Sequence, residues 1–296
     1  MMRIAAGLFT FVLLLPAGDA QGRIVHRERS LYSTILIDQQ GSLVCLQFSI
    51  RTDQRNQSCM DQRRPNEMVF SYTRMMMTGL LLRPSPERIL MIGLGGGTLP
   101  TALAELYPDT EIDVVEIDPA VVRVAGEFFG YVPSANTTVF TQDGRVFIKR
   151  AALRGDTYDL IMLDAFNGDY IPEHLMTREF LQETRSLLTP GGAVVANTFS
   201  ISQLYHHEST TYTAVFGRFY NLKTGESANR IILAANGPLP DPTIMEQRAA
   251  DLAPRVRKYG ISLSDHVKGL ETRPDWDTSA RVLTDQYAPA NLLRDR

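Results

Sequence analysis

RILMIGLGGG, residues 88–97, is the stretch that decides the fold. Its first half is a short, continuous apolar run of the kind that forms a strand buried on both faces. Its second half is rich in glycine, which lets the backbone turn sharply and approach a ligand closely. A helical pattern over residues 98–107 follows directly. This order of strand, glycine turn and helix predicts a nucleoside-binding α/β unit, with Gly93, Gly95 and Gly97 at the ligand.

Strand and helix patterns continue to alternate after this unit. Strands are expected at residues 111–117, 139–140, 158–163 and 193–198, and helices at 119–129, 144–150 and 177–188. Such alternation predicts a mostly parallel sheet with helices on both faces. We therefore expect a Rossmann-like domain over residues 86–296, in which a helix at 243–259 precedes a loop-rich end.

A different pattern precedes residue 86. Two short β-rich runs, 33–37 and 43–48, flank the turn sequence Asp38-Gln39-Gln40-Gly41 and predict a pair of strands. Residues 67–82 carry apolar residues at helical spacing without proline, so a helix is expected there. We expect residues 21–85 to form a small β-rich N-terminal domain.

The first 20 residues have the composition of a secretory signal peptide. Met1-Met2-Arg3 is a positive start, Ile4 to Pro16 is almost purely apolar, and the segment ends at Gly18-Asp19-Ala20. The apolar run is shorter than the roughly 20 residues that span a bilayer. We expect cleavage before Gln21, no stable membrane span afterwards, and a periplasmic or secreted protein; an uncleaved N-terminal tether is the alternative.

Cys45 and Cys59 are the two cysteines of the chain. In an exported protein such a pair can close a loop, and a loop of ~15 residues stabilises by about 3 kcal/mol in the chain-entropy model. The alternative is two unpaired small core residues. Because no histidine pair at ligand spacing accompanies the cysteines, no metal site is predicted.

The net charge of the chain limits the kinds of partner that it can bind. The formal net charge is −3 at pH 7 and the isoelectric point is about 6.0. This balance lacks the basic field that binding to a phosphate backbone requires. We therefore expect a small-molecule substrate and no nucleic-acid partner.

Three acids follow successive predicted strands, where open α/β sheets place their ligands. Glu116 lies about twenty residues after the glycine turn, where a carboxylate accepts hydrogen bonds from two ribose hydroxyls. Asp143 and Asp164 follow the next two strands. The alternatives are a solvated strand-end acid for Glu116 and a helix N-cap for Asp143 or Asp164.

Five motifs, in their order and spacing, resemble the spermidine synthase (polyamine aminopropyltransferase) family. The likeness extends over roughly residues 26–235 and looks most like a divergent branch of the family. The motifs are Ile92-Gly93-Leu94-Gly95-Gly96-Gly97, Val114-Val115-Glu116-Ile117-Asp118, Thr141-Gln142-Asp143-Gly144-Arg145, Tyr158-Asp159-Leu160-Ile161-Met162-Leu163-Asp164 and Leu187-Leu188-Thr189-Pro190-Gly191-Gly192.

The resemblance implies the fold of S-adenosylmethionine-dependent methyltransferases and a role for each acid. Glu116 would hold the ribose of the donor, Asp143-Gly144 would hold its adenine, and Asp164 would deprotonate the attacking amine. Ile117 is a further candidate for donor binding. It implies S-adenosylmethionine or its decarboxylated form as co-substrate, with no tightly bound cofactor, an amine or polyamine acceptor, and a homodimer. Tyr32 and Tyr72 are candidates to line the acceptor pocket, with plain packing as the alternative.

The chain departs from the family where the cationic amines would bind. Gly96 stands where the family carries an acid, Asn167 replaces a second acid, and Thr73-Arg74 replaces a His-Glu pair. Each change removes a charge-assisted hydrogen bond worth about 1.5–3 kcal/mol. Asp169 is a substitute candidate for the base. Besides an aminopropyltransferase, the alternatives are therefore a methyltransferase and an exported, non-catalytic protein that binds an adenosyl ligand.

Overall fold

The computed structural model describes residues 22–49, 56–165, 172–200, 203–225 and 228–294. The predicted signal peptide lies outside these residues, so its prediction stands on sequence alone. Among the helices of the described ranges, none is both long and apolar enough to cross a membrane.

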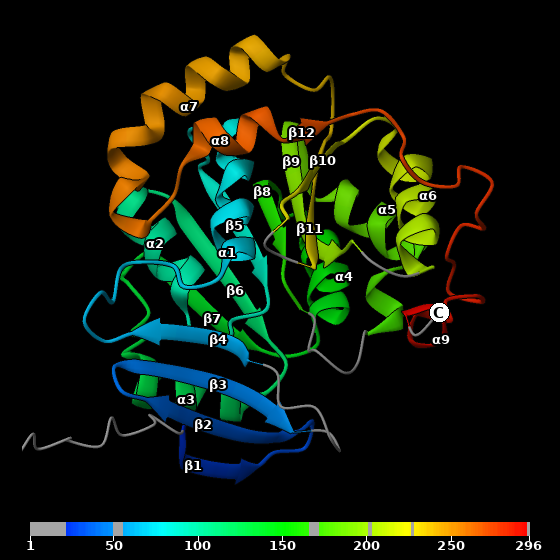
Figure 1. Cartoon of the computed structure of the whole chain (residues 1–296). Coiled ribbons are helices and arrows are strands. Elements are labelled where there is room, and N and C mark those ends of the chain that lie inside the picture. Colours follow the sequence, from blue (N-terminus) through cyan, green and yellow to red (C-terminus); the bar gives the residue numbers. More distant parts are fainter. Residues whose placement is uncertain (1–21, 50–55, 166–171, 201–202, 226–227, 295–296) are drawn as a thin grey trace, which may run out of the picture.

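Two β-sheets organise the described residues (Figure 1). The smaller sheet is antiparallel, with its strands in chain order: β1 (Arg23–Arg29), β2 (Thr34–Gln40), β3 (Leu43–Ser49) and β4 (Asn56–Asp61). The sequence predicted β2 and β3. It did not predict β1 and β4, because both are polar and lack the apolar alternation of a half-buried strand.

The larger sheet has the order β12-β10-β11-β9-β8-β5-β6-β7. The five strands from β9 to β7 are parallel neighbours, and the other three extend the sheet in antiparallel pairing. The mostly parallel α/β fold predicted from the sequence is therefore confirmed. Its strands are β5 (Arg88–Ile92), β6 (Glu111–Glu116), β7 (Thr137–Thr141), β8 (Tyr158–Leu163), β9 (Leu188–Phe199), β10 (Tyr220–Lys223), β11 (Asn229–Ala235) and β12 (Leu270–Glu271).

Helices cover both faces of the larger sheet, and each layer has its own apolar core. One face carries α1 (Ser71–Met76), the 3-10 helix η1 (Met77–Leu81), α2 (Thr98–Leu106), α3 (Pro119–Phe129), α7 (Pro242–Val256) and α8 (Leu263–Lys268). The opposite face carries α4 (Gly144–Arg154), α5 (Arg178–Ser186) and α6 (Leu204–Phe216). Short turns at η2 (Glu173–Leu175) and η3 (Arg257–Tyr259) and the terminal α9 (Ala290–Arg294) complete the described helices.

Several boundaries differ from those that the sequence predicted. The helix expected from residue 67 begins at Ser71 and continues as a 3-10 helix after Met76. The helix expected to end at residue 150 continues to Arg154, and Gly155, with φ 77°, ends it. The strand expected from 193 starts at Leu188. It passes through Pro190 because its pairing with β8 is irregular at that point.

Helix α3 joins the two sheets. Its residues Val121, Val124 and Phe129 form a separate apolar cluster with buried side chains of the small sheet, among them Ile35 and Leu46. Figure 1 shows the small sheet lying against α3. This packing holds the small sheet next to the carboxyl ends of β5 and β6, where the sequence predicts the ligand. The predicted domain boundary at residue 85 stays a prediction; α1 and η1, which precede it, pack on β9 and β11 of the large sheet.

Candidate functional site

The glycine turn after β5 is held by its neighbours. The Gly93 N–H donates to the carbonyl of Val115 at the end of β6, and the Asp164 N–H donates to the carbonyl of Ile92, both at 2.8 Å. Gly93 has φ 103°, and a Cβ at this position would lie 2.1 Å from the Asp164 carbonyl oxygen. Only glycine fits here, since both the backbone conformation and the contact exclude a side chain. The ends of β5, β6 and β8 therefore meet at one point.

Glu116 is the last residue of β6 and reaches into the glycine turn. Its Oε2 accepts from the Leu94 N–H and its Oε1 from the Asp118 N–H, each at 3.0 Å. Burial raises the pKa of Glu116, whereas these backbone hydrogen bonds lower it. The carboxylate is thus fixed at the turn, and each oxygen retains a lone pair for a ligand hydroxyl. Ile117, beside it, is an apolar side chain that is 36% exposed.

Asp143 caps helix α4, as the alternative interpretation of the sequence expected. Its Oδ1 accepts from the Val146 N–H at 2.9 Å, and its Oδ2 lies 2.9 Å from Nε2 of His174. The contact with His174 lowers the pKa of Asp143. The carboxylate is therefore held at the end of the strand next to β6, followed by Gly144 at the start of α4. Its predicted contact with adenine stays a prediction.

Asp164 directly follows β8 and lies in a partly buried position. Asn197 Nδ2 donates to its Oδ1 at 2.9 Å, and the Tyr72 hydroxyl also forms a hydrogen bond with the carboxylate. Burial raises the pKa of Asp164 to about 6, while these two hydrogen bonds oppose the rise. Near neutral pH the group is thus ionised, yet it is a better proton acceptor than an ordinary aspartate.

Asn197 and Asn229 belong to this site and were not predicted from the sequence. Asn229 Nδ2 donates to Asn197 Oδ1 at 2.9 Å, so the amide that faces Asp164 is itself oriented. The polar Asn197 interrupts an apolar strand, and that interruption was the available signal. Asn229 carries no local signal, because it reaches the site through the antiparallel pairing of β11 with β9.

Replacing Asn197 by Ala is expected to move the acidic limb of the pH–rate profile to higher pH. The amide hydrogen bond stabilises the charged form of Asp164, so its removal raises a pKa that is already about 6. One hydrogen bond of about 1 kcal/mol corresponds to a movement of somewhat less than one pH unit.

The measurement is the turnover number between pH 5 and 8. Asn236→Ala is the matched control, because Asn236 binds backbone carbonyls at the opposite end of β9. If the acidic limb of the profile does not move in the Asn197 variant, the expected effect of this amide on the pKa of Asp164 is wrong.

The two tyrosines that were predicted to line the acceptor pocket lie in different parts of the structure. Tyr72 contacts Asp164, whereas Tyr32 lies in the turn between β1 and β2 with 51% of its surface exposed. The side chains of Thr73 and Arg74 form hydrogen bonds with the backbone. The Thr73 hydroxyl donates to the Phe70 carbonyl, and the Arg74 guanidinium donates to the Met68 carbonyl. Asn167 and the substitute base Asp169 lie outside the described residues.

These features define a class of protein. The glycine turn, the acids at the ends of neighbouring parallel strands and the partly buried Asp164 are typical of a Rossmann-like α/β protein with a nucleoside site at this edge of the sheet. The comparisons with known proteins narrow this class.

A family model described as the spermine/spermidine synthase domain matches residues 69–226. The chain is 50% identical over 284 residues to the polyamine aminopropyltransferase of Vibrio vulnificus (strain CMCP6), and the match covers 95% of each chain. The chain therefore belongs to the spermine/spermidine synthase family, and the resemblance stated from the motifs is confirmed.

Two solved structures are similar in fold. The crystal structure of a probable spermidine synthase from Corynebacterium glutamicum ATCC 13032 gives a TM-score of 0.63 at 21% identity, covering 88% of this chain and 99% of that one. Human methyltransferase-like protein 13 in complex with SAH gives a TM-score of 0.59 at 27% identity, covering 71% and 96%. The fold is thus shared by proteins named as synthases and as methyltransferases.

Proposed function

We propose that this chain is a polyamine aminopropyltransferase, which transfers the aminopropyl group of decarboxylated S-adenosylmethionine to an amine. The proposal rests on one observation. The partly buried Asp164, whose pKa is about 6, and Glu116, which is fixed at the glycine turn, lie at the same edge of the sheet. The near full-length similarity to the Vibrio vulnificus protein of that name supports it.

The reaction needs little chemistry from the protein, because a sulfonium carbon is already activated. A new C–N bond forms as the C–S bond breaks, the electron pair of that bond stays on sulfur, and the amine loses a proton. Asp164 is placed to accept that proton, and Tyr72 and Asn197 hold its carboxylate in position. Glu116 would bind the ribose, while Ile117 and the Asp143-Gly144 pair would flank the adenine.

The direct test is product formation. Purified protein supplied with decarboxylated S-adenosylmethionine and putrescine should release methylthioadenosine and form spermidine, measured by liquid chromatography. A panel of other diamines and polyamines identifies the acceptor. If the protein binds the donor and releases no methylthioadenosine with any amine, aminopropyl transfer is wrong.

A methyltransferase is the second candidate. Two observations favour it: Gly96 stands in the glycine turn where the family has an acid, and the fold matches human methyltransferase-like protein 13. A methyltransferase binds S-adenosylmethionine itself, whereas an aminopropyltransferase selects the decarboxylated form. Calorimetric titration with the two compounds separates the candidates, and no affinity for either favours a protein without this catalytic role.

We also propose that the chain is exported. The apolar segment at the start of the sequence supports export, as does the Cys45–Cys59 disulfide, since disulfides persist in oxidising compartments. N-terminal sequencing of protein isolated from its native host should give Gln21 as the first residue; an intact Met1 in the cytosolic fraction would refute export.

A further inference from the structure

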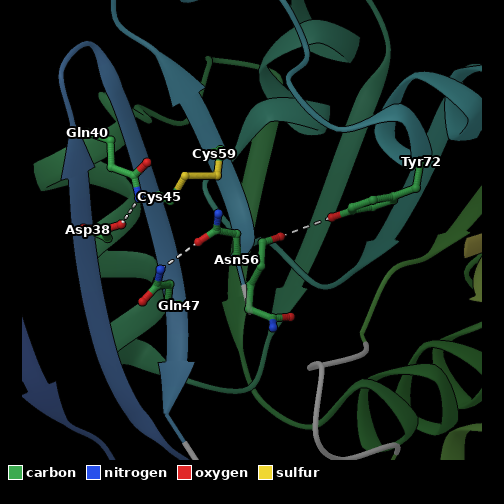
Figure 2. Close-up of a disulfide and its surroundings, with 8 residues drawn as sticks. Asp38, Gln40, Cys45, Gln47, Asn56, Cys59 and Tyr72 are labelled. Atoms are coloured by element: carbon green, nitrogen blue, oxygen red, sulfur yellow. Dashed lines mark hydrogen bonds between the residues drawn. A yellow bond between two sulfur atoms is a disulfide. The ribbon is translucent and has the colours of Figure 1, made fainter. Parts of the chain in front are cut away.

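The Cys45–Cys59 disulfide joins two neighbouring strands of the small sheet. The two residues are directly paired across β3 and β4, and both side chains are buried. The sequence left open whether these cysteines pair, and the structure shows that they do. The bond therefore connects β4 covalently to the middle of the small sheet (Figure 2).

Strand β4 is the edge strand of that sheet, and it is polar. Its pairing with β3 shifts between Leu46 and Gln47: Ser58 pairs with Leu46, Asn56 pairs with Gln47, and Gln57 is the additional residue of a bulge. An edge strand with few apolar side chains specifies its own register weakly, and a slip of one residue turns every side chain to the other face. Cys45 is adjacent to Leu46, where the pairing shifts, and Cys59 lies two residues from the bulged Gln57.

The two residues beside the disulfide contact the site. Ser58 packs on the glycine turn: a Cβ on Gly96 would lie 2.7 Å from the Ser58 hydroxyl, and one on Gly95 would lie 3.6 Å from its Cβ. The bulged Gln57 places its carbonyl 3.3 Å from the Tyr72 hydroxyl, whose single hydrogen is shared between this carbonyl and the Asp164 carboxylate. Figure 2 shows the Tyr72 ring directed at β4.

We infer that the Cys45–Cys59 disulfide is a positioning element of the donor site, which locks β4 in the register that places Ser58 on the glycine turn and the Gln57 carbonyl on Tyr72. A second contact, from Gln47 Nε2 to Asn56 Oδ1 at 2.8 Å, supports the strand on the other side of the bulge. The inference rests on the proposed adenosyl site, and it predicts that ligand binding depends on the redox state of the two cysteines.

The experiment uses the full chain and methylthioadenosine as the probe, because binding of this nucleoside does not require turnover. Cys45→Ala combined with Cys59→Ala should raise its dissociation constant about tenfold, which corresponds to loss of about 1.4 kcal/mol of binding free energy. Wild-type protein whose two thiols have been freed by reduction should match the double variant. The same reductant should leave the double variant unchanged.

Two further variants separate positioning from plain stability. Ser58→Val keeps the disulfide and crowds the glycine turn, so it should weaken methylthioadenosine binding with little change in melting temperature. Met245→Ala is the control, because Met245 is fully buried on helix α7, in the core of the large sheet and outside the small sheet. It should lower the melting temperature as the loss of the disulfide does, and leave the dissociation constant unchanged.

Three results would overturn the inference: wild-type affinity in the double cysteine variant, wild-type affinity in Ser58→Val, or equal loss of affinity in Met245→Ala. Different results would refute the proposed function. A wild-type protein that binds methylthioadenosine in a disulfide-dependent manner, yet transfers no aminopropyl group, would refute the activity and support the positioning role. A wild-type protein that binds no adenosyl compound refutes both.

Discussion

Asp164→Asn should lower the turnover number by roughly 10²- to 10⁴-fold, the usual contribution of a positioned general base. The introduced amide has nearly the same shape as the carboxylate, and its oxygen can still accept from Asn197 Nδ2. It cannot accept a proton from the attacking amine. Because the nucleoside-binding residues lie on other strands, the dissociation constant of methylthioadenosine should change little.

Single-turnover kinetics with decarboxylated S-adenosylmethionine measure the chemical step directly. Asp109→Asn provides the matched control, since Asp109 is an exposed acid in a loop on the same domain. Wild-type turnover in the Asp164 variant would assign the proton to another acceptor. A parallel loss of turnover and of methylthioadenosine affinity would instead indicate that the variant disturbs the whole site.

Glu116→Gln should weaken the binding of every adenosyl compound by roughly 10- to 150-fold. Two backbone N–H groups, of Leu94 and Asp118, donate to the two carboxylate oxygens. A glutamine has one acceptor oxygen, so its NH₂ group would face one of these donors. Charge-assisted hydrogen bonds of this kind contribute about 1.5–3 kcal/mol each, and the ribose hydroxyls would lose an ionised acceptor as well.

Calorimetry with methylthioadenosine and with decarboxylated S-adenosylmethionine gives the dissociation constants. Glu111→Gln serves as the control, because Glu111 begins the same strand, is exposed, and pairs with Arg88 at the end far from the glycine turn. Undiminished affinity in Glu116→Gln would remove the ribose assignment, and equal losses in both variants would point to a general effect on β6.

Local signals explain which elements the sequence predicted correctly. The sequence predicted both ends of helix α3 correctly, because Asp118 caps it, Pro119 begins it and Gly130, with φ 67°, ends it. Both ends of strand β8 were predicted correctly, because all six of its residues are buried and the last four, residues 160–163, form a continuous apolar run in the sequence. Strands β10 and β11 were missed; β11 pairs antiparallel with β9 and β10 with β11, so their places in the sheet follow from tertiary pairing.

By itself, the amino-acid sequence determined the parallel sheet, the glycine turn and the positions of Glu116, Asp143 and Asp164, because strand ends and glycine conformations depend on neighbouring residues. The tertiary structure alone decided what surrounds Asp164. Tyr72 comes from a helix that precedes the sheet and Asn197 from a later strand, and burial together with these contacts sets the pKa of Asp164. Such environments arise from packing between segments far apart in the chain, so no local pattern encodes them.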